Sequence, residues 1–331
     1  MKKITILFFA VLLAFPVQKI IAQSDSIHVG FILANLYSER WHHDRDYFQE
    51  RFNQLGGQVT FIDCYDMPNN QIEAAKKLVA KKVDCIVIVA VDARSAKSAV
   101  DIANNANIPV VAYDRLIIGA DLDLYITVNS VTVGKFMAEQ VMKKLSEGEI
   151  LYVGGPSDDF NSTLIRKGVF SELEKKKEKY KVKSVQTASW NELDSYMLIQ
   201  EYITNESSIP DAMICAADAL TYGAIDVLKE YNNYGKVLLT GQDAELEICR
   251  QVIQGNILMT VYKSNKQLAY KSAEATMKLI KGEKIDVTEK IDNKKMEVPS
   301  VMLTPILITK DNAVEVLTKE GVYTKEELTT E

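Results

Sequence analysis

Polar and aromatic side chains suited to holding a small hydrophilic molecule recur along the chain, each shortly after a short apolar run. They are Arg40, Trp41, Asp114, Arg115, Asp159, Asn161, Trp190, Asp218, Asp243 and Lys263. Carboxylates, amides and cationic groups can pair with hydroxyls, which both donate and accept hydrogen bonds. An indole ring can pack against the apolar C–H face of a sugar ring. These residue types predict a binding site for a polyhydroxylated ligand, with a monosaccharide as the leading candidate.

Motifs for covalent chemistry are missing from the sequence. It contains no dinucleotide fingerprint, no phosphate loop, no GxSxG elbow and no credible Cys/His pair, and Gly154-Gly155 has neither phosphate-binding spacing. His42 and His43 are adjacent, so on a helix they point to different faces, which argues against a metal site. We therefore expect a binding protein without catalytic residues, metal or cofactor. An enzyme on the same scaffold is the alternative, and turnover of a candidate sugar would reveal it.

Apolar runs and amphipathic stretches alternate along the first half of the chain. This alternation predicts strands over 27–33, 58–63, 84–89, 108–113 and 125–128, and helices over 39–55, 70–81 and 95–105. The pair Gly56-Gly57 is a helix stop after the first amphipathic stretch. Repeated strand–helix pairs predict a parallel sheet covered by helices on both faces.

The same rhythm restarts in the second half. Strands are predicted over 149–153, 182–187, 212–215, 237–239 and 258–261, with helices between them. No Pro/Gly/Ser-rich linker separates the halves, so we expect an α/β protein of two doubly wound, Rossmann-like lobes joined by a hinge. Ligands of open parallel sheets bind beyond the carboxyl ends of the strands, which is where the candidate residues lie.

The N-terminus has the parts of a secretory signal peptide. Two lysines, an apolar run over 4–15 and a small residue, Ala22, predict a signal over 1–22 with cleavage after Ala22 and export to the periplasm. An uncleaved membrane anchor is the alternative, because Lys19 and Ile20 suit a cleavage region poorly. The full chain has a formal net charge of −6, and cleavage would remove the lysines of this segment and make the charge more negative. A negatively charged protein is a poor partner for nucleic acid. The lysine cluster over 175–179 is typical of a solvated helix end.

The four cysteines are Cys64, Cys85, Cys215 and Cys249. They have no CxxC spacing and no nearby histidine, which argues against zinc. Cys64 and Cys85 lie in successive strand-like segments and could pair in an oxidising compartment. Buried free thiols are the favoured interpretation, because both residues sit in apolar strand contexts.

Six segments carry a more specific resemblance. They are Glu39-Arg40-Trp41, Asp44-Arg45-Asp46, Ala112-Tyr113-Asp114-Arg115, Gly241-Gln242-Asp243-Ala244, Met259-Thr260-Val261-Tyr262-Lys263 and Val298-Pro299-Ser300-Val301-Met302-Leu303-Thr304-Pro305. In order and spacing, from about Ile27 to about Thr324, the chain resembles the D-xylose-binding members of the type I periplasmic sugar-binding family. One such segment would be weak evidence, whereas six in sequence are strong evidence for the family.

The resemblance implies a hinged clamp with the sugar in its cleft. It implies an N-terminal lobe of 27–129 plus 264–302 and a C-terminal lobe of 130–263 plus 303–331. By position, it implies ligand contacts from Arg40, Asp114 and Arg115 on the first lobe, from Asp159, Asn161, Asp243 and Lys263 on the second lobe and hinge side, and ring packing by Trp41 and Trp190. It also implies delivery of D-xylose to an ABC-type permease by a monomeric protein.

The chain departs from the family pattern in three places. Ala217-Asp218 stands where an Asn-Asp pair is usual, Phe160 stands where a polar residue is frequent, and Ala34-Asn35 lacks the usual acidic pair. Loss of one neutral hydrogen bond costs on the order of 1 kcal/mol, so these changes bear on which sugar is bound rather than on the fold.

A sugar sensor of the same fold is an alternative function; it would present the closed form to a membrane histidine kinase instead of a permease. A sugar-responsive DNA regulator of related fold is disfavoured, because it would need a helix-turn-helix before the first lobe, where the sequence predicts a signal peptide.

Overall fold

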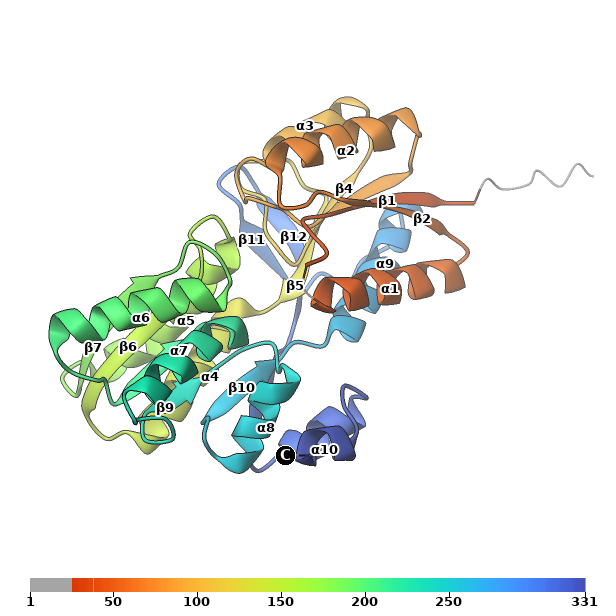
Figure 1. The fold of residues 1–331 in the computed structure, drawn as a ribbon. Coiled ribbons are helices and arrows are strands. Elements are labelled where there is room, and N and C mark those ends of the chain that lie inside the picture. Colours follow the sequence, from red (N-terminus) through yellow and green to blue (C-terminus); the bar gives the residue numbers. More distant parts are fainter. Residues whose placement is uncertain (1–25, 38, 331) are drawn as a thin grey trace, which may run out of the picture.

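The computed structural model describes residues 26–37 and 39–330, so the predicted signal peptide lies outside the described residues. The chain forms two separate β-sheets, and helices cover both faces of each sheet (Figure 1). This architecture confirms the predicted class of two doubly wound α/β lobes. We call the part built on the seven-stranded sheet the first lobe and the part built on the six-stranded sheet the second lobe.

The first lobe is built on a sheet with the strand order β11-β12-β5-β4-β3-β1-β2. Its strands are β1 (His28–Leu33), β2 (Gln58–Asp63), β3 (Cys85–Ile88), β4 (Val110–Tyr113), β5 (Leu124–Val128), β11 (Glu289–Asp292) and β12 (Glu297–Leu303). All neighbours are parallel except β11, which pairs antiparallel with β12 at the edge. Every residue of β3, β4 and β5 is buried, which explains why these strands are continuous apolar runs.

Helices cover both faces of this sheet. On one face lie α2 (Pro68–Ala80) and α3 (Lys97–Asn105), and on the other lie α1 (Glu39–Gln54) and α9 (Asn265–Ile280) (Figure 1). Each face has its own buried apolar cluster. The first lobe therefore includes helix α9 and strands β11 and β12, which lie far along the sequence from its other elements.

The second lobe is built on a sheet with the order β13-β10-β9-β8-β6-β7, in which only β13 is antiparallel to its neighbour. Its strands are β6 (Gly148–Gly154), β7 (Tyr180–Gln186), β8 (Ala212–Cys215), β9 (Leu238–Thr240), β10 (Met259–Tyr262) and β13 (Ile306–Thr309). Its helices are α4 (Ser130–Lys144), α5 (Phe160–Leu173), α6 (Glu192–Glu206), α7 (Asp218–Glu230), α8 (Leu246–Gln254), α10 (Ala313–Lys319) and α11 (Lys325–Thr329), with a short 3-10 turn over Glu174–Lys176.

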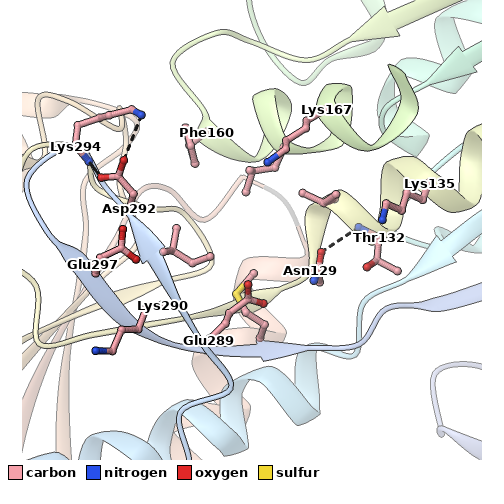
Figure 2. A pocket seen from close by; sticks show the side chains of 14 residues that line it. Asn129, Thr132, Lys135, Phe160, Lys167, Glu289, Lys290, Asp292, Lys294 and Glu297 are labelled. Atoms are coloured by element: carbon pink, nitrogen blue, oxygen red, sulfur yellow. Dashed lines mark hydrogen bonds and ion pairs between the residues drawn. The ribbon is translucent and has the colours of Figure 1, made fainter. Parts of the chain in front are cut away.

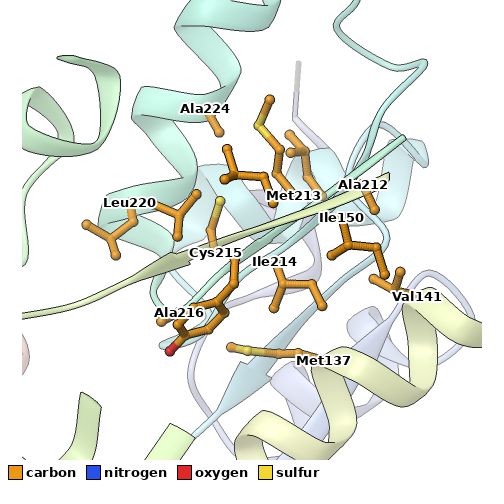
Figure 3. Close-up of a cluster of buried hydrophobic side chains, with 14 of the residues drawn as sticks. Met137, Val141, Ile150, Ala212, Met213, Ile214, Cys215, Ala216, Leu220 and Ala224 are labelled. Atoms are coloured by element: carbon orange, nitrogen blue, oxygen red, sulfur yellow. The ribbon is translucent and has the colours of Figure 1, made fainter. Parts of the chain in front are cut away.

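The core of the second lobe lies on both sides of β8. Met137 and Val141 of α4 pack from one side and Leu220 and Ala224 of α7 from the other (Figure 3). Helices α4 and α5 approach closely: a Cβ atom added to Gly134 would lie 2.0 Å from the carbonyl oxygen of Ile165. Glycine is therefore required at this crossing of the two helices.

The chain crosses between the sheets in neighbouring segments. It leaves the first sheet after Val128, returns after Tyr262 and leaves again after Leu303. Val128 and Leu303 are paired at the ends of β5 and β12, and the backbone N–H of Asn129 donates to the carbonyl of Leu303 at 2.9 Å. Two of the crossings therefore run side by side.

The cysteine prediction is settled in favour of free thiols: Cys64, Cys85, Cys215 and Cys249 are all buried and unpaired. Burial raises the pKa of each thiol, to about 12 for Cys64 and Cys215. Such thiols are poor nucleophiles, because the thiolate is the reactive form.

Candidate functional site

The candidate residues lie on the facing edges of the two sheets. In the first lobe, Arg40 and Trp41 lie in the first turn of α1, and Asp114 and Arg115 follow β4. In the second lobe, Asp159 and Asn161 lie at the start of α5, Trp190 precedes α6, Asp218 begins α7, Asp243 follows β9 and Lys263 follows β10. These positions are the carboxyl ends of parallel strands and the amino ends of the helices that follow them.

Arg40 is the centre of a charged group that spans both lobes. Its guanidinium lies 2.5 Å from an oxygen of Asp114 in the first lobe and 3.8 Å from Oδ1 of Asp243 in the second. The Nζ atom of Lys263 lies 2.9 Å from the same Oδ1 of Asp243. Four of the predicted residues thus meet as two carboxylates and two cations.

Both carboxylates of this group are carried on unusual backbone. Asp114 has φ 61° and Asp243 has φ 108°, in the left-handed region that residues with a side chain rarely adopt. Strained backbone of this kind is concentrated at functional sites, where the surrounding structure holds it in place. Tyr125 and Thr127 hold the backbone of Asp114 in this conformation. Tyr125 Oη donates to the Asp114 carbonyl at 3.0 Å, and Thr127 Oγ1 donates to it at 2.8 Å.

The ionisation of this group follows from its mutual contacts. Burial opposes the charge on Asp114, but Arg40 and Lys263 outweigh it and hold the pKa of this carboxyl below its usual range. Burial also opposes the charge on Arg40, and the carboxylates of Asp114, Asp44 and Asp243 outweigh it and raise the pKa of the guanidinium. Asp114 and Arg40 are therefore both charged at neutral pH.

A hydrogen bond from Asn161 joins the second lobe to the first lobe. Its Nδ2 donates to the carbonyl of Asp114 at 3.1 Å, and its Oδ1 accepts from Ser130 Oγ at 3.0 Å. The amide thus contacts the backbone that carries Asp114, across the boundary between the lobes.

A second charged group lies beside the first. Arg115 Nε is 3.1 Å from Oδ2 of Asp159, and Trp190 Nε1 donates to the same oxygen at 3.2 Å. The Trp190 ring lies on Gly155, where an added Cβ would come within 2.2 Å of the indole. Asp159 also caps α5, accepting from the backbone N–H of Asn161 at 2.9 Å.

Trp41 is largely buried in the apolar cluster on the α1 side of the first sheet. The guanidinium carbons of Arg40 and Arg115 lie 4.6 and 5.6 Å from its ring centroid. These are cation–π distances, so the indole supports the two arginines of the site.

Asp218 differs from the other candidates. It is fully buried, and its two oxygens accept hydrogen bonds from the backbone N–H of Glu245 at 2.8 Å and from Thr260 Oγ1 at 2.9 Å. Its backbone N–H donates to the carbonyl of Gln242 at 2.7 Å. Both oxygens are therefore occupied by protein groups, and they hold the loop that carries Asp243.

Asp44 is a residue of the site that the sequence analysis did not single out. It is fully buried, and its Oδ2 lies 3.4 Å from Nε of the Arg40 guanidinium. Its other oxygen accepts a hydrogen bond from Tyr113 Oη at 2.5 Å. The i, i+4 spacing of Arg40 and Asp44 is the signal that could have revealed the pair.

The pH dependence of stability should reveal the buried Asp44. Burial raises its pKa to about 6 in the folded protein, against the opposing effect of Arg40. The folded chain therefore retains a proton that the unfolded chain, with an aspartate pKa of about 3.9, releases. The contribution of Asp44 to stability is present below about pH 4 and is lost as the pH rises to about 6. As the pH rises from about 4 to 7, the unfolding free energy of the native protein should therefore fall by roughly 2–3 kcal/mol relative to that of the Asp44→Asn variant.

Denaturant titrations at several pH values measure this difference. Asp46→Asn, at an exposed position of the same helix, is the matched control. A difference between Asp44→Asn and the native protein that stays constant over this pH range would contradict the prediction.

A groove of about 540 Å³ lies beside the crossing between the lobes at Asn129, and not at the charged groups. We call it the hinge groove. Its walls are the start of α4, the start of α5 and the β11–β12 hairpin, with Phe160, Lys167 and Asn129 facing Asp292 and Glu289 (Figure 2). None of the predicted site residues is among the described residues that line it. At the charged groups, side chains of the two lobes instead contact one another directly.

Within residues 26–37 and 39–330, no group of three or more His, Cys, Asp or Glu side chains is placed to hold a metal ion. Within the same ranges, no helix has the length and apolar character needed to cross a membrane.

Known proteins resemble this chain over most of its length. Residues 29–284 match the family model described as the periplasmic binding protein domain. The chain is 32% identical over 310 residues to the D-xylose-binding periplasmic protein of Haemophilus influenzae, covering 93% of both chains. It is 29% identical over 310 residues to the D-xylose-binding periplasmic protein of Escherichia coli, covering 93% of this chain and 94% of that protein. A solved ABC transporter solute-binding protein from Clostridium phytofermentans, with bound β-D-glucose, matches with a TM-score of 0.83 at 22% identity, covering 91% of this chain and 100% of that one.

Proposed function

Because the chain belongs to the family of periplasmic binding protein domains, we propose that it captures a monosaccharide, D-xylose foremost, between its lobes and delivers it to an ABC-type permease. The observation that carries the proposal is the contact of Arg40 with a carboxylate from each lobe, Asp114 and Asp243. Relatives named for D-xylose binding support the choice of sugar. On this proposal the protein works in the periplasm as a monomer and catalyses no reaction.

In the proposed complex, sugar hydroxyls take places within the two charged groups. Hydroxyls would donate to Asp114, Asp159 and Asp243, and would accept from Arg40, Arg115 and Lys263. The Arg40–Asp243 contact is long at 3.8 Å and the Asp243 side chain is 28% exposed, so this pair can separate to admit a hydroxyl. Trp41 and Trp190 would pack on the sugar ring.

We assign the remaining candidates supporting roles. Asp218 would position the loop that carries Asp243, and Asn161 would position the backbone of Asp114. The lobes would be 27–129 with 264–302 and 130–263 with 303–331, moving about the crossing segments. A sugar that bridges the lobes stabilises the closed arrangement by its differential affinity for it.

Thermal denaturation with increasing sugar tests the proposal. A ligand at about 100 times its Kd adds about 2.7 kcal/mol to the unfolding free energy, which is roughly 4 °C in Tm for a chain of this size. We expect this shift with D-xylose and a smaller one with D-ribose, L-arabinose and D-glucose. Calorimetry then gives each Kd, and chromatography of the recovered sugar checks that it is unchanged.

The outcomes separate the parts of the proposal. Stabilisation by another sugar alone would overturn D-xylose and retain sugar binding. The absence of any shift across pentoses and hexoses would overturn sugar binding. Conversion of the sugar would overturn the assignment as a binding protein.

A further inference from the structure

One short segment of the second lobe is docked on the first lobe by contacts that need no ligand. This segment, Asp158–Asn161, comprises the end of the β6–α5 loop and the first two residues of α5, and we call it the clasp. The backbone N–H of Ala93, in the first lobe, donates to the carbonyl of Asp158 at 3.0 Å. Asp159 and Asn161 add the ion pair with Arg115 and the hydrogen bond to the Asp114 carbonyl.

Phe160 is the apolar part of the clasp. It is the first residue of α5, yet its half-buried side chain packs against the apolar cluster on the α2 side of the first sheet. Ile291 and Met302, from the first lobe, pack against the same cluster and line the hinge groove together with Phe160. Leu164, one helical turn further along α5, lines that groove but is not among the described residues of the first-lobe cluster.

The contacts of the clasp differ in how they respond to a ligand. The carboxylate of Asp159 and the guanidinium of Arg115 are groups that a sugar can engage instead. The Phe160 side chain offers no hydrogen-bonding group, and its contact removes apolar surface from water whether or not sugar is present. Closure of the lobes therefore has an apolar component of constant strength beside an electrostatic one that depends on the ligand.

We propose that Phe160 is an affinity-determining residue that contacts no sugar: it anchors the second lobe on the first and raises the population of the closed arrangement before ligand binds. The apparent Kd of a ligand equals its intrinsic Kd divided by the fraction of protein in the binding-competent state. A change in that fraction multiplies the Kd of every sugar by one factor. A change in a sugar contact alters different sugars to different extents.

The distance between the lobes without sugar is the direct test. Met67 and Leu193 are exposed residues on different lobes, at 54% and 64% exposure, and each can be replaced by cysteine for a spin or fluorescent label. The native cysteines are buried, which favours selective labelling. We expect Phe160→Ala to lower the ratio of closed to open protein about tenfold, the equivalent of about 1.4 kcal/mol for partial burial of a phenyl ring. Leu164→Ala removes a neighbouring apolar side chain of the same helix and should leave the ratio unchanged.

Affinity is the second readout, and it alone rests on the proposed function. The Kd of Phe160→Ala for D-xylose and for the next-best sugar should rise by the same factor, up to about tenfold, with their ratio unchanged. Different factors for the two sugars would place Phe160 in the sugar site and overturn the inference, as would a sugar-free distance distribution identical to that of the native protein. If no sugar binds, the proposed function fails while the distance measurement still decides the role of Phe160.

Discussion

Asp114→Asn is expected to weaken sugar binding about 100-fold while the protein stays folded. Asp114 is buried, pairs with Arg40 at 2.5 Å, and is kept ionised by Arg40 and Lys263. A hydroxyl that donates to such a carboxylate makes a charge-assisted hydrogen bond, worth about 1.5–3 kcal/mol. Asparagine keeps the shape of the side chain and tolerates the left-handed backbone at φ 61°. The substitution therefore removes the charge without adding backbone strain.

Calorimetric titration of Asp114→Asn with D-xylose measures the loss. Asp121→Asn is a suitable control, because Asp121 is an exposed residue of the same lobe that pairs with Lys295 at 2.6 Å. Unfolding of both variants should be followed in parallel, since Arg40 loses one of its carboxylate partners in Asp114→Asn. Native affinity in a folded Asp114→Asn protein would remove this residue from the ligand site.

Gly134→Ala is expected to lower the unfolding free energy by about 3 kcal/mol and Tm by roughly 4–5 °C. The added methyl would lie 2.0 Å from the backbone carbonyl oxygen of Ile165, so α4 and α5 would have to move apart. Alanine is intrinsically better than glycine within a helix by about 1 kcal/mol, but that gain is smaller than the packing loss. The reciprocal contact, in which a Cβ on Gly168 would meet the carbonyl oxygen of Val131 at 2.1 Å, leaves no room for compensation.

The same helix pair also bears on the site. Helix α4 follows the crossing at Val128, and α5 begins with the residues of the clasp. A shift between these helices should therefore displace Asp159 and Asn161 and weaken sugar binding as well. Lys135→Ala, at the next and exposed position of α4, is the control and should change stability by no more than about 0.5 kcal/mol. A Gly134→Ala protein as stable as the native one would show that the two helices can separate freely.

Local sequence patterns predicted most of the fold. The apolar run over 84–89 contains β3, and the amphipathic stretch over 39–55 contains α1, which ends at Gln54 just before Gly56-Gly57. These agreements arise because a strand buried on both faces needs consecutive apolar residues, and a covering helix needs one apolar stripe. The motif resemblance, which spans the same lobes, is confirmed by the match of residues 29–284 to the periplasmic binding protein domain.

Other elements escaped the pattern analysis for a physical reason. Strand β11 at the sheet edge is mostly exposed, so its sequence Glu-Lys-Ile-Asp has no apolar run to detect. Strands β12 and β13 follow close on one another but belong to different sheets, and no local periodicity reports a change of sheet. The predicted signal segment lies outside the described residues and stays a prediction.

The amino-acid sequence by itself determined which residues stand at the ends of strands, because strand ends are local features of the chain. It could not determine how those residues pair, because Arg40, Asp114 and Asp243 are separated by long stretches whose relative placement depends on the packing of whole lobes. Only the tertiary structure shows that Asp218 bonds within its own lobe, that Asn161 contacts the backbone of Asp114 and that Phe160 packs on the opposite lobe. Burial and distance across a hinge are properties of the assembled lobes, and no stretch of sequence records them.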